Sequence, residues 1–274
     1  MGKSERRDSI DDIKNYYTSS SEDRRLGIQQ LEFEITRRLL DRYLKPNSNV
    51  LELGAGGGRY TVELLDKGHR VTSVEMVPGL VEVSRQSIQA KGLVASATLI
   101  NGDARDFRDH TQETFDVALA MGPFYHLVSA PERATLLKDM IAAVKPGGLV
   151  ITIHLTRVGL MGYMMTRFPA WGLEAPDQIK HIMTAGHLPD HPRNGEFRGY
   201  FTTLKEIQQL HEKHGLEIVR LHSQDPCIGS VDEIFNRLPD DIKEAWADAL
   251  TALSHDPLAL GSGRGIFCVA CHKT

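Results

Sequence analysis

The stretch from Asn49 to Tyr60, NVLELGAGGGRY, constrains the fold more than any other part of the chain. Val50, Leu51 and Leu53 predict a buried strand, and the glycines that follow let the backbone turn sharply and come close to a ligand. These glycines fit G-x-G-x-G, whereas the dinucleotide pattern G-x-G-x-x-G would need glycine where Arg59 stands. The loop therefore predicts a nucleotide-type site and argues against NAD.

Strand and helix patterns alternate on both sides of this loop. Strands are expected at residues 50–53, 69–75, 97–100, 114–121, 149–155, 216–222 and 265–272, and helices at 26–44, 60–66, 79–90, 131–144, 202–214 and 240–253. Short connections between such elements imply a parallel, doubly wound α/β sheet.

Two segments fall outside this alternation. Residues 1–45 are expected to form an N-terminal helical lid, in which Ile10 to Tyr17 have an amphipathic pattern that fits either a lid helix or a surface arm. Residues 156–201 are rich in Met, Pro, Gly and His without a clean period, which predicts a cap inserted on the substrate side. Residues 46–155 would then form the cofactor-binding core, and residues 202–274 would complete the sheet.

The amino-acid composition restricts the kinds of partner that the chain is expected to bind. The chain of 274 residues is 41% apolar and 25% charged, with a net charge of −4 and dispersed basic residues, which fits a globular enzyme and disfavours nucleic acid as a partner. There is no signal-like or membrane-length apolar run, and Cys227, Cys268 and Cys271 form no disulfide framework. We therefore expect a cytoplasmic monomer or homodimer without a membrane partner.

Three acidic residues complete a candidate adenosyl site. Glu52 places a carboxylate beside the glycine loop, and Glu75, 21 residues after Gly54, can accept both ribose hydroxyls, unless it is only a solvated strand end. Asp103 can accept a hydrogen bond from the adenine amino group, cap the next helix, or do both. Met76 fits the adenine face or the core about equally well. This arrangement favours S-adenosylmethionine as cofactor.

Five segments, VLELGAGGGRY, VTSVE, NGDARDF, MGPFYHL and VKPGG, occur in the order typical of class I S-adenosylmethionine-dependent methyltransferases. The sequence resembles a bacterial small-molecule branch of that family over roughly residues 25–155, and the tail HDPLALGSGRGIFCVACHK is similar too. The resemblance implies a Rossmann-like, seven-stranded sheet with the last strand antiparallel, and S-adenosylhomocysteine as product. The cofactor-binding residues expected are Glu52, Gly54, Ala55, Gly56, Gly58, Glu75, Met76, Asp103, Ala104, Met121 and Gly122.

The segment MGPFYHL follows the fourth strand, where the reactive methyl group would lie. His126 is a candidate general base because imidazole changes charge near neutral pH, and Tyr125 is a candidate for orienting the nucleophile. A turn that only shapes the pocket is equally consistent, since methyl transfer needs mainly alignment. Candidate substrate contacts are Tyr16, Tyr17, Phe124, Arg157 and Tyr200.

No metal site is expected. His181, His187 and His191 lack a partner carboxylate pair, and Pro189 interrupts the helix that would align the last two. Cys268 and Cys271 are an odd number of residues apart in a strand, so their side chains point to opposite faces.

The prediction is methyl transfer by in-line displacement from S-adenosylmethionine to an oxygen, nitrogen or carbon atom of a small molecule. Two alternatives stay open: an RNA, protein or peptide methyltransferase, and a non-catalytic protein that binds the cofactor for regulation.

Overall fold

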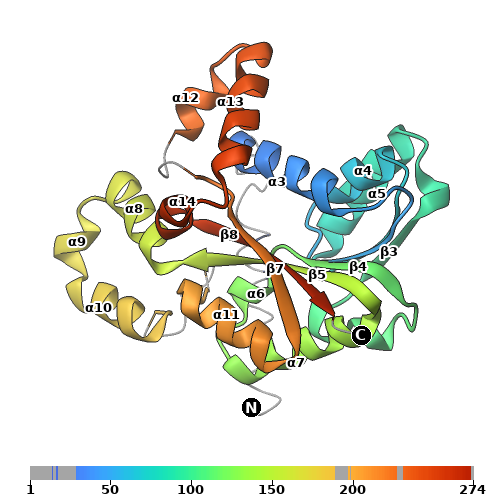
Figure 1. Ribbon diagram of the computed structural model, residues 1–274, viewed down its shortest axis with the longest axis horizontal. Coiled ribbons are helices and arrows are strands. Elements are labelled where there is room, and N and C mark those ends of the chain that lie inside the picture. Colours follow the sequence, from blue (N-terminus) through green and yellow to red (C-terminus); the bar gives the residue numbers. More distant parts are fainter. Residues whose placement is uncertain are drawn as a thin grey trace.

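The computed structural model describes residues 14, 17, 29–188, 197, 199–226 and 231–272. Its centre is a sheet with the strand order β3-β2-β1-β4-β5-β8-β7 (Figure 1). The strands are β1 (Asn49–Leu53), β2 (Arg70–Glu75), β3 (Ala97–Asn101), β4 (Phe115–Ala120), β5 (Val144–Thr156), β6 (Phe201–Thr202), β7 (Leu216–Ser223) and β8 (Gly265–His272).

Strands β1 to β5 are parallel, and β8 runs antiparallel to both of its neighbours, β5 and β7. The predicted sheet with an antiparallel last strand is confirmed. The two-residue strand β6 was not expected; it pairs in parallel with the end of β5 and makes an eight-stranded sheet.

Helices cover both faces of the sheet, because successive strand residues point to opposite sides and both sides are apolar. Val50 packs with α3, α4 and α5, whereas its neighbour Leu51 packs with η2, α6 and α7. The helices are α3 (Gln30–Tyr43), α4 (Arg59–Asp66), α5 (Pro78–Ala90), η1 (Val94–Ser96), η2 (Ala104–Asp109), α6 (Pro123–His126), α7 (Ala130–Ala143), α8 (Arg157–Arg167), α9 (Trp171–Glu174), α10 (Pro176–Ala185), α11 (Leu204–Lys213), α12 (Asp232–Asn236), α13 (Asp240–Leu253) and α14 (Pro257–Ser262).

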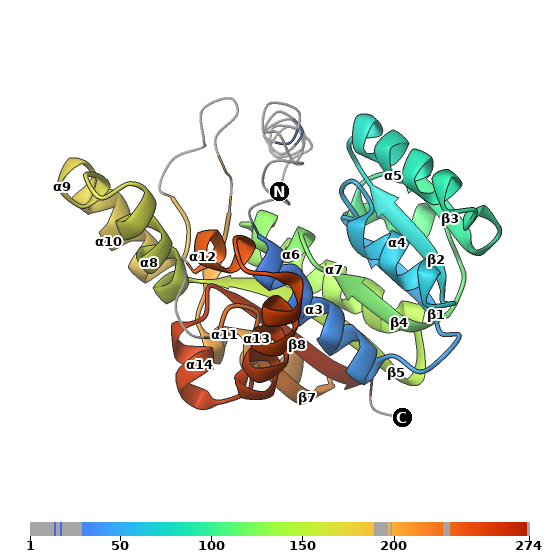
Figure 2. The ribbon, with the colours of Figure 1, turned by 90° about the horizontal axis from the view of Figure 1, so that it is seen from above.

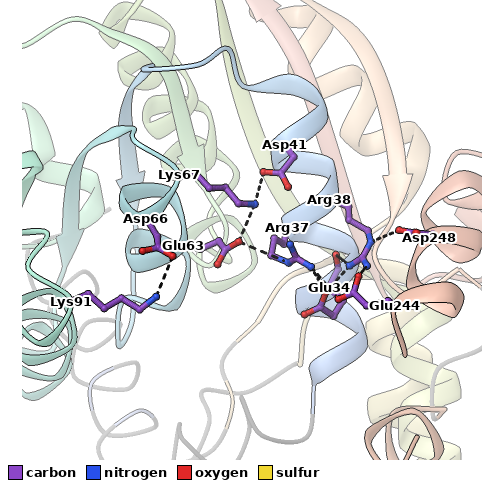
Figure 3. A network of polar contacts seen from close by, with 10 residues as sticks. All are labelled: Glu34, Arg37, Arg38, Asp41, Glu63, Asp66, Lys67, Lys91, Glu244 and Asp248. Carbon is purple, nitrogen blue, oxygen red and sulfur yellow. Dashed lines mark hydrogen bonds and ion pairs between the residues drawn. The ribbon is translucent and has the colours of Figure 1, made fainter. Parts of the chain in front are cut away.

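Ion pairs join α3 to the helices on either side of it (Figure 3). Lys67, at the end of α4, pairs with Asp41 at 2.5 Å and with Glu63 at 2.9 Å, while Arg38 pairs with Asp248 of α13 at 2.7 Å. Exposed pairs of this kind contribute only about 0–1 kcal/mol each. The buried apolar face of α3 stabilises its packing, and the ion pairs fix its orientation above the sheet.

No helix was predicted in the segment 156–201, because its sequence has no clean apolar period, but the part that the structure describes is largely helical. It forms α8, α9 and α10, which lie at the opposite end of the molecule from α4 and α5 (Figure 2). Thr156 caps α8 by accepting a hydrogen bond from the Gly159 amide at 2.9 Å. The three helices bury at most two residues each, so their sequences show no apolar period.

Only Lys14 and Tyr17 of the expected lid helix belong to the described residues, and both are helical. The division of the chain into lid, core and cap stays a prediction. Within the ranges given above, no helix is both long and apolar enough to cross a membrane.

Candidate functional site

A cleft opens at the carboxyl ends of β1, β2 and β4, where the strand order turns back between β1 and β4. Ligands bind at this position in open α/β sheets. The cleft encloses about 1080 Å³, its open mouth included, at the upper end of the roughly 300–1,000 Å³ of small-molecule sites. The predicted residues that line it are Tyr17, Glu52, Gly54, Ala55, Gly56, Glu75, Met76, Asp103, Ala104, Met121, Gly122, Tyr125 and His126.

The glycines after β1 serve different purposes. Gly54 has φ +71°, and a Cβ there would lie 2.8 Å from Cδ of Pro123, across the cleft floor. Gly56 has open space on the side where a Cβ would stand, so a ligand can approach its backbone. Gly58, predicted as a cofactor contact, is outside the cleft lining; a Cβ there would overlap Oγ of Ser84, so this glycine lets the loop pack on α5.

Glu75 is held at the end of β2 by the backbone. Its Oε2 accepts a hydrogen bond from the Gly56 amide and its Oε1 from the Val77 amide, both at 2.8 Å. These two bonds fix the carboxylate on the cleft wall, beside the glycine loop. Because a carboxylate offers about four acceptor positions, a bound polyol hydroxyl can still share it.

Glu52 lies beneath the loop with 2% of its surface exposed. Burial raises the pKa of its carboxyl group to about 7, the nearby charge of Glu75 raises it as well, and the Thr61 hydroxyl, which donates to Oε2 at 2.5 Å, lowers it. The group is thus partly protonated near neutral pH. A cationic ligand in the cleft would favour its ionised form.

Asp103 follows β3 and caps η2. Its Oδ1 accepts a hydrogen bond from the Arg105 amide at 2.9 Å, and its Oδ2 lies 2.6 Å from Nη2 of Arg105. Arg105 also pairs with Glu132 at 2.6 Å, and these contacts raise its pKa although burial opposes them. The capping role considered for Asp103 is therefore present, and the residue still lines the cleft next to Ala104.

At the other end of the cleft, aromatic rings surround His126, whose exposed surface is 5%. The Tyr17 hydroxyl lies 2.8 Å from Nε2 of His126, and the Tyr125 ring centroid is 4.7 Å from that of His126. Leu127 and Ile153 complete an apolar wall. This end can hold a flat, apolar molecule beside one imidazole and two phenol side chains.

Three of the predicted substrate residues lie elsewhere. Phe124 is 1% exposed and packs on His154 in the core, with 5.4 Å between ring centroids. Arg157 is buried and pairs with Glu206 at 2.7 Å, so it supports the protein rather than the cleft. Tyr200 lines a separate cavity, and Tyr16 is outside the described residues.

Several lining residues were missed from the sequence. Glu32 reaches the cleft from α3, and its Oε2 pairs with Nη2 of Arg264 at 3.0 Å. Arg59, which argued against NAD, also lines the cleft, with its guanidinium 3.6 Å from the centre of the Phe33 ring. Tyr60, the residue after Arg59, also lines the cleft. Arg59 and Tyr60 directly follow the glycine loop in sequence, so their place in the cleft could have been predicted. No local sequence feature indicated that Glu32 would line it.

Within the described ranges, no three His, Cys, Asp or Glu side chains are grouped to hold a metal ion. The His181 and His187 rings pack edge to face at 5.1 Å, and His191 is outside those ranges. Cys268 is fully buried in an apolar cluster, and burial raises its pKa to about 12, whereas Cys271 is partly exposed.

Comparison with known proteins gives a consistent result. A family model described as a methyltransferase domain matches residues 50–148. A demethylmenaquinone methyltransferase from Bacillus cereus (strain ATCC 10987 / NRS 248) is 27% identical over 192 residues, which are 68% of this chain and 76% of that protein.

Solved structures share the fold at low sequence identity. The CcbJ methyltransferase from Streptomyces caelestis has a TM-score of 0.60 and 17% identity, covering 87% of this chain and 94% of that one. A S-adenosylmethionine-dependent methyltransferase from Methanosarcina mazei has a TM-score of 0.57 and 16% identity, covering 86% and 97%. The family match spans β1 to the first part of β5, and so includes the glycine loop, Glu75 and Asp103.

Proposed function

We propose that this chain, which is a class I S-adenosylmethionine-dependent methyltransferase, methylates a small molecule bound against Tyr17, Tyr125 and His126. The observation that carries the proposal is the continuity of the cleft, because one cavity joins the glycine loop and Glu75 to these three side chains. A cofactor at the first end and an acceptor at the second would meet above Met121 and Gly122.

The residues at the first end fit S-adenosylmethionine. The open side of Gly56 admits close approach of a ligand, and the fixed carboxylate of Glu75 suits the ribose hydroxyls. Asp103 and Ala104 would face the adenine, and the ionised form of Glu52 would favour a positively charged ligand. When bound, the cofactor supplies a methyl group activated on a sulfonium.

The protein's own residues would position the acceptor. Tyr125, Leu127 and Ile153 offer an apolar and aromatic surface that excludes water and aligns a flat molecule. For His126 to take a proton from the attacking atom, its Nε2–H would donate to the Tyr17 hydroxyl oxygen, which holds the imidazole in place, and Nδ1 would be the proton acceptor.

Two observations favour a small acceptor over RNA or a protein. The acceptor end lies inside a cleft whose walls are largely apolar, and the chain carries a net charge of −4 without a basic stripe. The name of the relative from Bacillus cereus also supports a small-molecule acceptor, since demethylmenaquinone is one.

The test is an acceptor assay with S-adenosylmethionine labelled in its methyl group. Purified protein is incubated separately with a small-metabolite extract, total RNA and a protein extract, and label is measured in each fraction. We expect label in the small-metabolite fraction, in amounts matching the S-adenosylhomocysteine formed. Label in RNA or protein alone would establish a macromolecular acceptor instead, and tight cofactor binding without transfer to any fraction would favour the regulatory alternative.

A further inference from the structure

A second cavity lies between α7, α11 and the end of β5, and it shares no lining residue with the cleft. The side chains that matter in its wall are Arg133, His154, Tyr200, Glu206, Leu210 and Lys213. The proposed methyl transfer does not use this cavity.

Arg133 is a buried cation with an unused donor edge. It is 8% exposed, and its Nη1 donates to the carbonyl oxygens of Leu127 and Val128 at 2.6 and 2.7 Å, which takes both hydrogens of that nitrogen. Among the described residues, no carboxylate lies within 4.0 Å of its guanidinium, and Nε and Nη2 have no acceptor. The Nε–Nη2 edge is the one that matches the two oxygens of a carboxylate.

The two carboxylates nearest this cation pair with other arginines, Glu132 with Arg105 and Glu206 with Arg157. Glu206, the acidic side chain of the cavity wall, is already engaged: Oε1 pairs with Arg157 at 2.7 Å and Oε2 accepts from the Thr203 amide at 2.8 Å. Lys213 adds a second positive charge at the exposed rim. Burial lowers the pKa of Arg133, although its interactions with Tyr200, Glu206 and Glu132 oppose this shift.

Tyr200 fixes the plane of the guanidinium. The Cζ atom of Arg133 lies 3.5 Å from the centre of the Tyr200 ring, so the ring covers the face of the guanidinium and leaves its edge available. The apolar side chains of Ile207 and Leu210 form another part of the wall. The cavity therefore combines a planar anion-binding edge with apolar surface.

The protonation of His154 follows from a chain of hydrogen bonds. Nδ1 of His211 must donate to the Ile207 carbonyl oxygen, 2.8 Å away, and burial lowers the pKa of His211 to about 4, so its Nε2 is an acceptor. The Thr152 hydroxyl then donates to His211 and accepts from Nε2 of His154, at 3.0 and 2.8 Å. Nε2 of His154 therefore carries a hydrogen. Burial, and then the nearby charge of Arg133, hold the pKa of His154 well below its usual value, so the ring is neutral, Nδ1 is an acceptor, and His154 does not add to the positive charge of the cavity.

We propose that this cavity is a binding site for a small organic acid, whose carboxylate is held by the Nε–Nη2 edge of Arg133 and whose apolar part contacts Leu210. Lys213 attracts the anion at the rim. A carboxylate fits better than inorganic phosphate because the two free donors lie in one plane and the neighbouring wall is apolar.

The site is tested by isothermal titration calorimetry on the full chain, with benzoate, acetate and inorganic phosphate as probes and no S-adenosylmethionine present. Benzoate should bind, and more tightly than acetate. Arg133→Lys keeps the charge but loses the planar fork, so benzoate affinity should fall at least tenfold. Lys138→Ala, which removes an exposed charge on the same helix, should leave it unchanged.

Because Arg133 also holds two backbone carbonyls, its substitution can disturb folding, and circular dichroism must show that the variant is folded. Lys213→Glu changes only the exposed rim and tests the site independently; we expect at least a tenfold loss of benzoate affinity. The proposal is overturned if benzoate does not bind, if Lys213→Glu and Lys138→Ala bind it equally well, or if phosphate binds and benzoate does not.

Discussion

The two ends of the cleft are built in different ways. At the proposed cofactor end, one short loop and the ends of neighbouring strands supply the lining, and backbone amides hold the carboxylate of Glu75. At the proposed acceptor end, Tyr17 and His126, which are 109 positions apart in sequence, lie in contact, and Ile153 comes from another strand. Backbone geometry therefore fixes the first end of the cleft, whereas the second end depends on side chains that packing brings together.

The largest expected effect concerns His126. If it takes the proton from the acceptor, His126→Gln should lower kcat by about 10²–10⁴-fold while S-adenosylhomocysteine affinity stays within twofold or so. Tyr17→Phe, which removes the hydroxyl at 2.8 Å, should lower kcat by less, roughly tenfold. The measurements are steady-state kinetics and calorimetry. An unchanged kcat for His126→Gln would show that alignment of the acceptor with the methyl group is enough for catalysis, without a general base.

The second prediction concerns Glu75, whose substitution should change cofactor affinity. Glu75→Ala should weaken S-adenosylhomocysteine binding about 100-fold, because two charge-assisted hydrogen bonds of roughly 1.5 kcal/mol each are lost. Glu82→Ala, on the exposed side of α5, is the matched control and should bind as the wild type does. Calorimetry that finds equal affinity for both variants would remove Glu75 from the cofactor site.

Glu52 gives the cofactor end a dependence on pH. Because its folded pKa, about 7, is above its ordinary value of 4.5, its contribution to stability is full below pH 4.5 and is lost as the pH rises to about 7. The loss amounts to about 3 kcal/mol. The melting temperatures of the wild type and of Glu52→Gln should therefore diverge between pH 5 and pH 8. At high pH the variant should have the higher melting temperature. If the stability of the two proteins changes in parallel with pH, the carboxyl group of Glu52 does not titrate in this pH range.

The smallest expected effect comes from a pair of glycine variants, which distinguish the cost of backbone strain from a change in the shape of the cleft. Gly54→Ala and Gly147→Ala both place a side chain at positive φ, +71° and +75°, and each should cost about 1–2 kcal/mol of unfolding free energy. Only the Cβ at residue 54 would also meet Pro123, since nothing lies within 4 Å at residue 147. Calorimetry should accordingly show weaker S-adenosylhomocysteine binding for Gly54→Ala alone. Equal binding by the two variants would mean that Pro123 moves aside freely.

Much of the fold followed from local patterns. The helix at Asp240–Leu253 and the strand at Gly265–His272 have the predicted bounds, and the other predicted strands lie within a few residues of theirs. The helices α8 to α10 were missed because they bury too few apolar residues to show a period. Helix α6 was missed because it has four residues.

The sequence by itself determined the end of the cleft that is proposed to bind the cofactor. The glycine loop and Asp103 follow strands and Glu75 ends one, and the carboxyl ends of parallel strands meet at one edge of a sheet whatever the rest of the chain does. Local sterics and strand periodicity are sufficient for that result.

Only the tertiary structure decided the acceptor end and the second cavity. It placed Glu32 and Tyr17 in the cleft, buried Phe124 in the core, and left Arg133 with an unused donor edge between two helices. The physical reason is that side-chain burial and pairing depend on which distant segments pack together, and no local pattern in the chain specifies those neighbours.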